Sequence, residues 1–135
     1  MFERDAFIER SLRKITKWFY PAATVTVSAA AWTTINTIAI PTNTVTFIEA
    51  RLNAVRTDAG QEAAEGSIMK LLGGFRNDAG TVNKIDVKSP IDGEDDATVD
   101  RRFLISGTDV LVQFFGVAGK DFSVYGWGMK SSVSV

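Results

Sequence analysis

The C-terminal stretch Phe103–Val135, FLISGTDVLVQFFGVAGKDFSVYGWGMKSSVSV, decides the fold class of this 135-residue chain. Apolar, β-branched and aromatic runs at 103–105, 110–115 and 122–129 alternate here with SGTD at 106–109 and GVAGKD at 116–121. Short runs of this kind, separated by Gly, Asp and Ser, are typical of consecutive antiparallel strands joined by tight turns. The stretch therefore predicts an all-β protein.

The same alternation continues upstream of this stretch. In Thr44–Arg56, small or apolar residues occupy every second position and polar residues lie between them, which predicts a half-buried strand. Its inward positions are Ile48, Ala50, Leu52 and Ala54, and its outward positions are Glu49, Arg51 and Asn53.

The middle of the chain, residues 66–97, predicts a further hairpin. Ser67–Arg76 is expected to be a strand in which Gly73 and Gly74 mark a bulge or a close backbone contact. Asn77–Gly80 predicts the hairpin turn, 81–88 the returning strand, and 89–97 an acidic loop. Together the patterns predict about eight strands, an antiparallel β-sandwich with a jelly-roll-like arrangement over residues 21–135.

Residues 1–20 have a different period and are expected to form a separate N-terminal arm. Apolar residues recur there at three- and four-residue spacing, with charged residues on the other face, which predicts an amphipathic helix. Its apolar stripe is Phe7, Ile8, Leu12, Ile15, Trp18 and Phe19. The stripe is a candidate protein-interaction surface. It can cap the sandwich of its own chain, insert into a neighbouring subunit, or lie on a membrane surface.

Composition excludes several functional classes. The chain has 15 basic and 16 acidic residues, so no concentrated positive charge favours nucleic acid. It has no cysteine and no histidine, which removes disulfides, zinc–thiolate sites and the commonest general base. No hydrolase, zinc-protease or nucleotide-binding signature occurs, so we expect no enzyme and no cofactor. The charged N-terminus predicts no secretion signal, and no apolar stretch is long enough to span a membrane.

An acidic group at Asp92, Glu94, Asp95 and Asp96 is the second candidate site. Its spacing is not that of an EF-hand loop. Three interpretations stay open, which are a solvated turn, an electrostatic contact with a basic partner, and a calcium site.

Tyr125 and Trp127 form the third candidate site, because alternate residues of a strand point to the same face. Two aromatic rings on one face can stack against sugar rings. They can equally belong to the core of the sandwich.

Three segments resemble a β-sandwich module that recurs in virion structural proteins of tailed bacteriophages. They are TFIEARLNAVRT at Thr46–Thr57, GFRNDAGTV at Gly74–Val82 and ISGTDVLVQFFGVAGKDFSVYGWGMK at Ile105–Lys130, of which Ile105–Gln113 fits the pattern closely and Phe122–Trp127 loosely. The resemblance covers roughly residues 44–133, and its motifs are turns and strands, not catalytic signatures.

This resemblance implies a virion structural protein that is assembled in the host cytoplasm. The expected role is a head-decorating or cement protein, a homo-oligomer (a trimer is favoured) that contacts the major capsid protein or other virion proteins. The alternatives are a tail-tip or fibre module that binds host-surface glycan, and a tail or neck subunit. No nucleic acid or membrane partner is expected.

Overall fold

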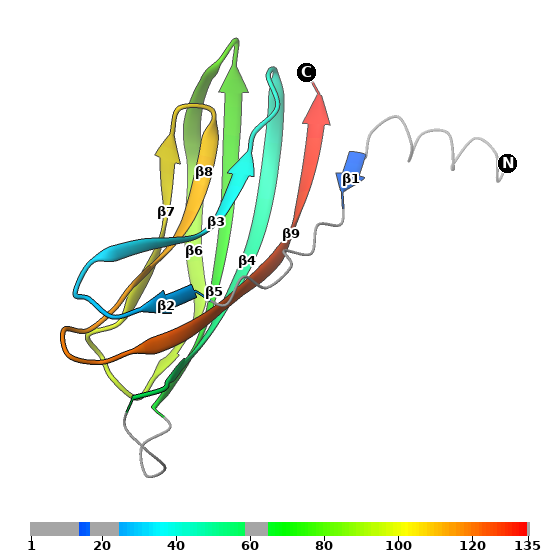
Figure 1. Ribbon diagram of the computed structural model, residues 1–135. Coiled ribbons are helices and arrows are strands. Elements are labelled where there is room, and N and C mark those ends of the chain that lie inside the picture. Colours follow the sequence, from blue (N-terminus) through cyan, green and yellow to red (C-terminus); the bar gives the residue numbers. More distant parts are fainter. Residues whose placement is uncertain (1–13, 17–24, 59–64, 135) are drawn as a thin grey trace, which may run out of the picture.

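The computed structural model describes residues 14–16, 25–58 and 65–134, and these form two antiparallel sheets (Figure 1). The larger sheet has the strand order β1-β9-β4-β5-β6, and β2 also pairs with β9. The smaller sheet has the order β3-β8-β7. The strands of the larger sheet are β1 (Lys14–Thr16), β2 (Val25–Val27), β4 (Thr44–Arg56), β5 (Gly66–Asp78), β6 (Thr81–Glu94) and β9 (Phe122–Ser134). Those of the smaller sheet are β3 (Trp32–Ala39), β7 (Asp100–Ser106) and β8 (Asp109–Phe115).

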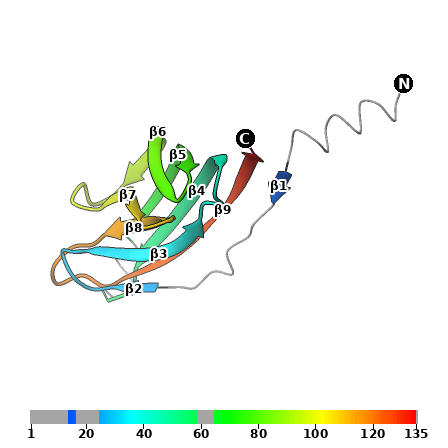
Figure 2. The same cartoon turned by 90° about the horizontal axis from the view of Figure 1, so that it is seen from above.

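The all-β, two-sheet prediction is confirmed, and β4 shows why. Ile48, Ala50, Leu52 and Ala54 are buried, as the alternation predicted, whereas the residues between them face outward. The finer jelly-roll prediction is not confirmed, because β4, β5 and β6 follow one another as neighbouring strands of a meander. Seen from above, the smaller sheet covers one face of the larger sheet (Figure 2).

The core between the sheets is built around aromatic pairs. The Phe114 and Phe122 rings lie 5.9 Å apart, and the Phe75 and Phe103 rings meet edge-on at 5.4 Å. A Cβ at Gly73 would lie 2.6 Å from the Phe75 ring and 2.8 Å from that of Phe103. The close contact expected at Gly73-Gly74 is therefore real, and the β5–β6 register shifts between Gly74 and Phe75.

The expected acidic loop at 89–97 is corrected, because β6 continues to Glu94. Asp92 pairs with Met69 and Glu94 with Ser67 on β5. Pro90 and the carboxylates are tolerated because β6 is an edge strand, paired only with β5 among the described strands. Local polarity predicted a loop, whereas the long partner strand extends the pairing.

The helix predicted for the N-terminal arm is wrong at Lys14–Thr16. These residues form β1, which pairs with residues 130–132 of β9. The edge of β9 offers backbone hydrogen-bonding groups that a short segment can satisfy, and this non-local pairing overrides the helical spacing. Ile15 is thus in a strand. The other stripe residues lie outside the described residues, and the boundary at residue 20 stays a prediction. They are Phe7, Ile8, Leu12, Trp18 and Phe19.

The turn predicted at Asn77–Gly80 is confirmed and is tied to the core. Ala79 and Gly80 have φ of 51° and 98°. The buried Asn77 accepts a hydrogen bond from the Gly80 N–H at 2.8 Å and donates one to the Ile40 carbonyl at 2.8 Å. In the part of the chain that the structure describes, no helix is long and apolar enough to cross a membrane.

Gly126 fixes the distance between β9 and β3, and its substitution tests the sandwich packing. Asn36 of β3 donates a hydrogen bond to the Gly126 carbonyl at 3.5 Å, and a Cβ at residue 126 would collide with Asn36 Oδ1 and lie 2.7 Å from Ile35. We expect Gly126→Ala to lower the free energy of unfolding by about 1–3 kcal/mol, measured by urea denaturation. Gly74→Ala is the control, because its Cβ would meet only Ile85, at 3.6 Å. Equal midpoints for the two variants would contradict the packing described here.

Candidate interaction surface

The side of the larger sheet that faces away from the smaller sheet is called here the outer face. It is formed by the outward residues of β4, β5, β6 and β9. The register places Trp127, Arg51, Lys70 and Ile91 in one row across these strands. The next row is Tyr125, Asn53, Ile68 and Gly93. The expectation that Tyr125 and Trp127 share a face is therefore confirmed.

The outer face is rich in exposed apolar side chains. Of the eleven large hydrophobic residues that are exposed in the described parts of the chain, nine lie on β4, β5, β6 and β9, with exposures between 40% and 58%. They are Val45, Phe47, Val55, Ile68, Ile85, Ile91, Tyr125, Met129 and Val133. Exposed apolar side chains gathered on one face are typical of interaction sites.

Glu49 is the centre of an ion-pair group on this face. Its carboxylate lies 2.7 Å from Lys70 Nζ and 3.7 Å from Arg51 Nη2. The hydrogen bond from Lys70 lowers the pKa of Glu49 below its ordinary value. The Arg51 guanidinium in turn lies 4.7 Å from the centre of the Trp127 ring, a cation–π geometry. Trp127 is thus partly buried, whereas Tyr125 is 41% exposed.

The remaining charges of the face are also paired. Arg76 lies 2.9 Å from Asp78, and Lys88 lies 3.4 Å from Asp86. With the Glu49 group, the face holds four basic and three acidic side chains in ion pairs or cation–π contact. The face is therefore apolar with nearly balanced charge.

Two shallow hollows indent the outer face. One, of about 260 Å³, lies beside Trp127 and is lined also by Arg51, Asn53, Lys70 and Ile91. The other, of about 290 Å³, is lined by Phe47, Leu72, Gly74, Ile85 and neighbouring β6 residues. The first combines an aromatic ring with amide and cationic groups, and the second is mainly apolar.

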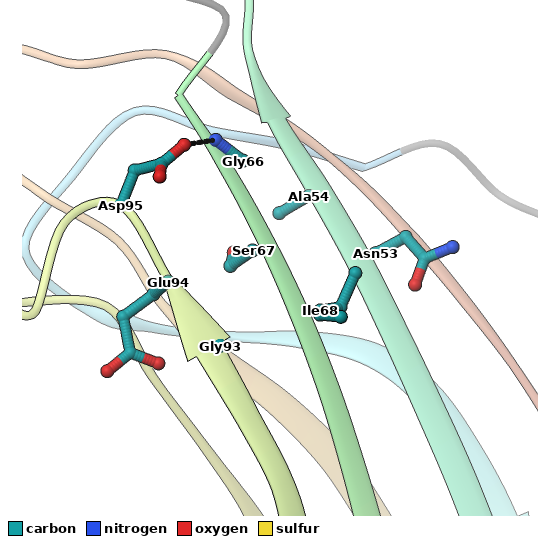
Figure 3. Close-up of a pocket in the computed structure, with 8 residues that line it drawn as sticks. All are labelled: Asn53, Ala54, Gly66, Ser67, Ile68, Gly93, Glu94 and Asp95. Atoms are coloured by element: carbon teal, nitrogen blue, oxygen red, sulfur yellow. Dashed lines mark hydrogen bonds between the residues drawn. The ribbon is translucent and has the colours of Figure 1, made fainter.

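A larger pocket of about 500 Å³ lies where β4 and β6 end and β5 begins (Figure 3). The Gly66 N–H donates a 2.8 Å hydrogen bond to Asp95, and the side chains of Glu94 and Asn53 lie on opposite sides of the pocket (Figure 3). The polar groups do not converge on one point. Of the two carboxylates that line the pocket, Glu94 and Asp95, the second is engaged by the Gly66 N–H.

The predicted acidic group does not form one open patch. Asp92 pairs with Arg101 at 2.9 Å, and the neighbouring Asp92 carboxylate raises the pKa of Glu94. Asp95 bonds to the Gly66 N–H, and Asp96 accepts hydrogen bonds from Lys120 Nζ at 2.6 Å and the Thr98 N–H at 2.9 Å. Within the described ranges, no group of three or more carboxylates could hold a metal ion.

An ionic cluster, which the sequence analysis missed, closes the end of the sandwich at the β6–β7 and β8–β9 loops. Lys120 Nζ lies 2.9 Å from Glu65 and 2.6 Å from Asp96, and Arg56 bridges Asp58 at 2.8 Å and Glu65 at 3.2 Å. The hydrogen bond from Lys120 lowers the pKa of Asp96 to about 2, and that from Arg56 lowers the pKa of Asp58. The cluster ties the ends of β4 and β5 to both loops.

The cluster predicts an acid transition. The pKa of Asp96 is lowered on folding from 3.8 to about 2, so its stabilising contribution is complete above the unfolded value and is lost as the pH falls through this window. We expect the urea midpoint of the wild type to decrease as the pH is lowered from 4 to 2. In Asp96→Asn the midpoint should depend less steeply on pH over the same range. Asp109→Asn is the control, because Asp109 makes no ion pair in the described structure. An unchanged slope in Asp96→Asn would contradict the role of the pair.

No protein-family profile and no curated protein sequence matches the chain. Solved structures that are similar to it include three tailspike proteins of Acinetobacter phages. The tailspike of Acinetobacter baumannii phage AM24 matches with a TM-score of 0.46 and 10% identity, over 90% of this chain and 26% of the tailspike. Tailspike gp49 of A. baumannii phage Fri1, a capsular polysaccharide depolymerase, matches with a TM-score of 0.39 and 13% identity, over 93% of this chain and 21% of the tailspike.

The third is the tailspike of Acinetobacter phage vB_ApiP_P1, with a TM-score of 0.36 and 14% identity over 90% of this chain and 22% of the tailspike. The chain therefore spans about a quarter of the length of the tailspikes that it matches.

Proposed function

We propose that this chain is a structural module of a tailed-bacteriophage virion, and that it acts by protein–protein contact through its outer face. The observation that carries the proposal is the outer face itself, an apolar surface with nearly balanced charge on a rigid sheet. Aromatic residues, Met and Arg are enriched at protein interfaces, and Trp127, Tyr125, Met129 and Arg51 all lie on this face.

The resemblance to the phage module supports the virion part of the proposal. The motif GFRNDAGTV lies at the β5–β6 hairpin, with its turn at Ala79 and Gly80. The motif ISGTDVLVQ lies at the β7–β8 hairpin, where Gly107 has φ of 59°. Two of the three segments that carry the resemblance therefore contain the turns of these hairpins, and the third, at Thr46–Thr57, lies mostly in β4. Turn residues determine the backbone of the module but not its surface side chains. Such a pattern is expected for a structural module.

The proposal has no catalytic step and no cofactor. The module contributes a rigid two-sheet body and a contact surface to the particle, which is assembled in the host cytoplasm. Head decoration, expected from the sequence, and a place in the tail or neck are both compatible with such a body. Immuno-electron microscopy of the virion distinguishes them, because the label falls on the head, the neck or the tail.

Incorporation into the particle tests the outer face. Ile68 is 58% exposed on this face, and Ile68→Lys would place an unpaired charge in the contact. We expect this variant to bind particles that lack the protein at least ten times more weakly than the wild type, measured by co-sedimentation, a loss of about 1.4 kcal/mol. Leu104→Lys, on the smaller sheet, is the matched control and should bind normally. Equal binding by both variants would place the contact elsewhere.

Glycan binding is the second candidate function, and the hollow beside Trp127 favours it. That hollow presents an indole edge, an amide and two cations, the groups that can stack on and hydrogen-bond a sugar. We expect Trp127→Ala to abolish binding of the purified protein to host cells while circular dichroism stays unchanged. Trp32→Ala is the control, because Trp32 is also stacked by an arginine, with Arg102 at 4.2 Å, but lies on the smaller sheet. Wild-type cell binding by Trp127→Ala would exclude this function.

A further inference from the structure

We propose that the outer face is covered by a second copy of this chain, so that the larger sheets of two copies pack against each other. The inference rests on the proposed function only in taking the outer face as the contact surface. It adds the identity of the partner, and it can be tested without any other virion component.

The charge of the face permits self-association. Its paired side chains comprise Arg51, Lys70, Arg76 and Lys88 against Glu49, Asp78 and Asp86, a net charge of +1. Two copies of a strongly charged face repel each other, whereas two copies of a balanced face do not. The same balance disfavours a polyanion such as nucleic acid, which requires a concentrated positive charge. The electrostatics therefore fit a copy of the chain itself.

The dimensions of the face fit a stable contact between copies. Outward residues of β4 run from Val45 to Val55, about 33 Å at the usual rise per residue, and four adjacent strands span about 19 Å. The face thus offers about 600 Å² per copy, and two copies bury about 1,200 Å², which exceeds the 1,000 Å² or so that specific interfaces need.

A sugar in the 260 Å³ hollow beside Trp127 would leave Phe47, Ile85 and Val133 exposed. Only a surface of similar size covers the whole apolar patch.

The edge strands of the larger sheet disfavour strand pairing between copies, and this favours packing of one outer face on another. The β6 edge carries Lys84, Lys88 and Pro90, and its pairing with β5 has two register shifts. Charged residues, proline and bulges at an edge strand disfavour pairing with a further strand. The opposite edge, on β9, already pairs with β1 and β2 at its two ends. Sheet extension between copies is thus disfavoured along β6, and six of the thirteen residues of β9, 122–124 and 130–132, are already paired at the opposite edge, which favours the outer face.

Analytical ultracentrifugation of the full chain, from 1 to 300 µM, tests the inference. We expect the average mass in solution to rise with concentration toward that of a dimer, because a twofold contact packs one outer face on another. Ile68→Lys and Met129→Lys should each weaken the association at least tenfold, whereas Leu104→Lys should leave it unchanged, with folding checked by circular dichroism and thermal unfolding.

Three outcomes would overturn the inference. The wild type could stay monomeric at 300 µM. It could associate with equal strength in both outer-face variants, which would place the interface elsewhere. Deletion of residues 1–13 could convert a monomer with a protected face into one that binds a hydrophobic dye, which would make the arm the occupant. A stable oligomer that fails to enter particles would leave the inference intact and overturn only the proposed virion role.

Discussion

The full-length pairing of β4 with both of its neighbours is the constraint on which the rest of the structure depends. β4 pairs with β5 from Thr44 to Val55 and with β9 from Thr44 to Arg56. A strand held on both edges cannot shift by one residue without moving every inward side chain to the outer face. The register of β4 thus determines the core and the interaction surface together. Ile48 and Leu52 enter the core only if Glu49, Arg51 and Asn53 face outward.

The Glu49 group shows how the outer face carries charged side chains with little net charge. Glu49 is only 15% exposed, and its carboxylate is held by Lys70 and Arg51. Arg51 also covers part of the Trp127 ring, so the cation shields an aromatic side chain in the free chain. Because these contacts are made within the chain, a partner that covers them does not have to supply counter-charges. The desolvation cost of burying them is reduced, which suits a surface that alternates between solvent and a contact.

The features that sequence reasoning predicted well are those set by nearby residues. The alternation in 44–56 and the turn at Asn77–Gly80 follow from side-chain period and backbone chemistry, and both are confirmed. The extension of β6 to Glu94, the strand at Lys14–Thr16 and the Lys120–Asp96 pair were missed. Each depends on a partner that is at least 21 residues away. Asp92 and Lys14 have ordinary loop and helix contexts, and only the edges of β5 and β9 give them strand geometry.

The unequal size of the two sheets explains why an apolar surface remains. In the described residues, six strands form one sheet and three form the other, and the smaller sheet lies on one side only. A sheet that is covered on one face normally shows polar residues on the other. Here the outward positions also include Phe47, Ile68, Ile91 and Met129, all of them exposed. The outer face combines these apolar side chains with the ion pairs around Glu49, Arg76 and Lys88, a composition that fits the contact with a second copy proposed above.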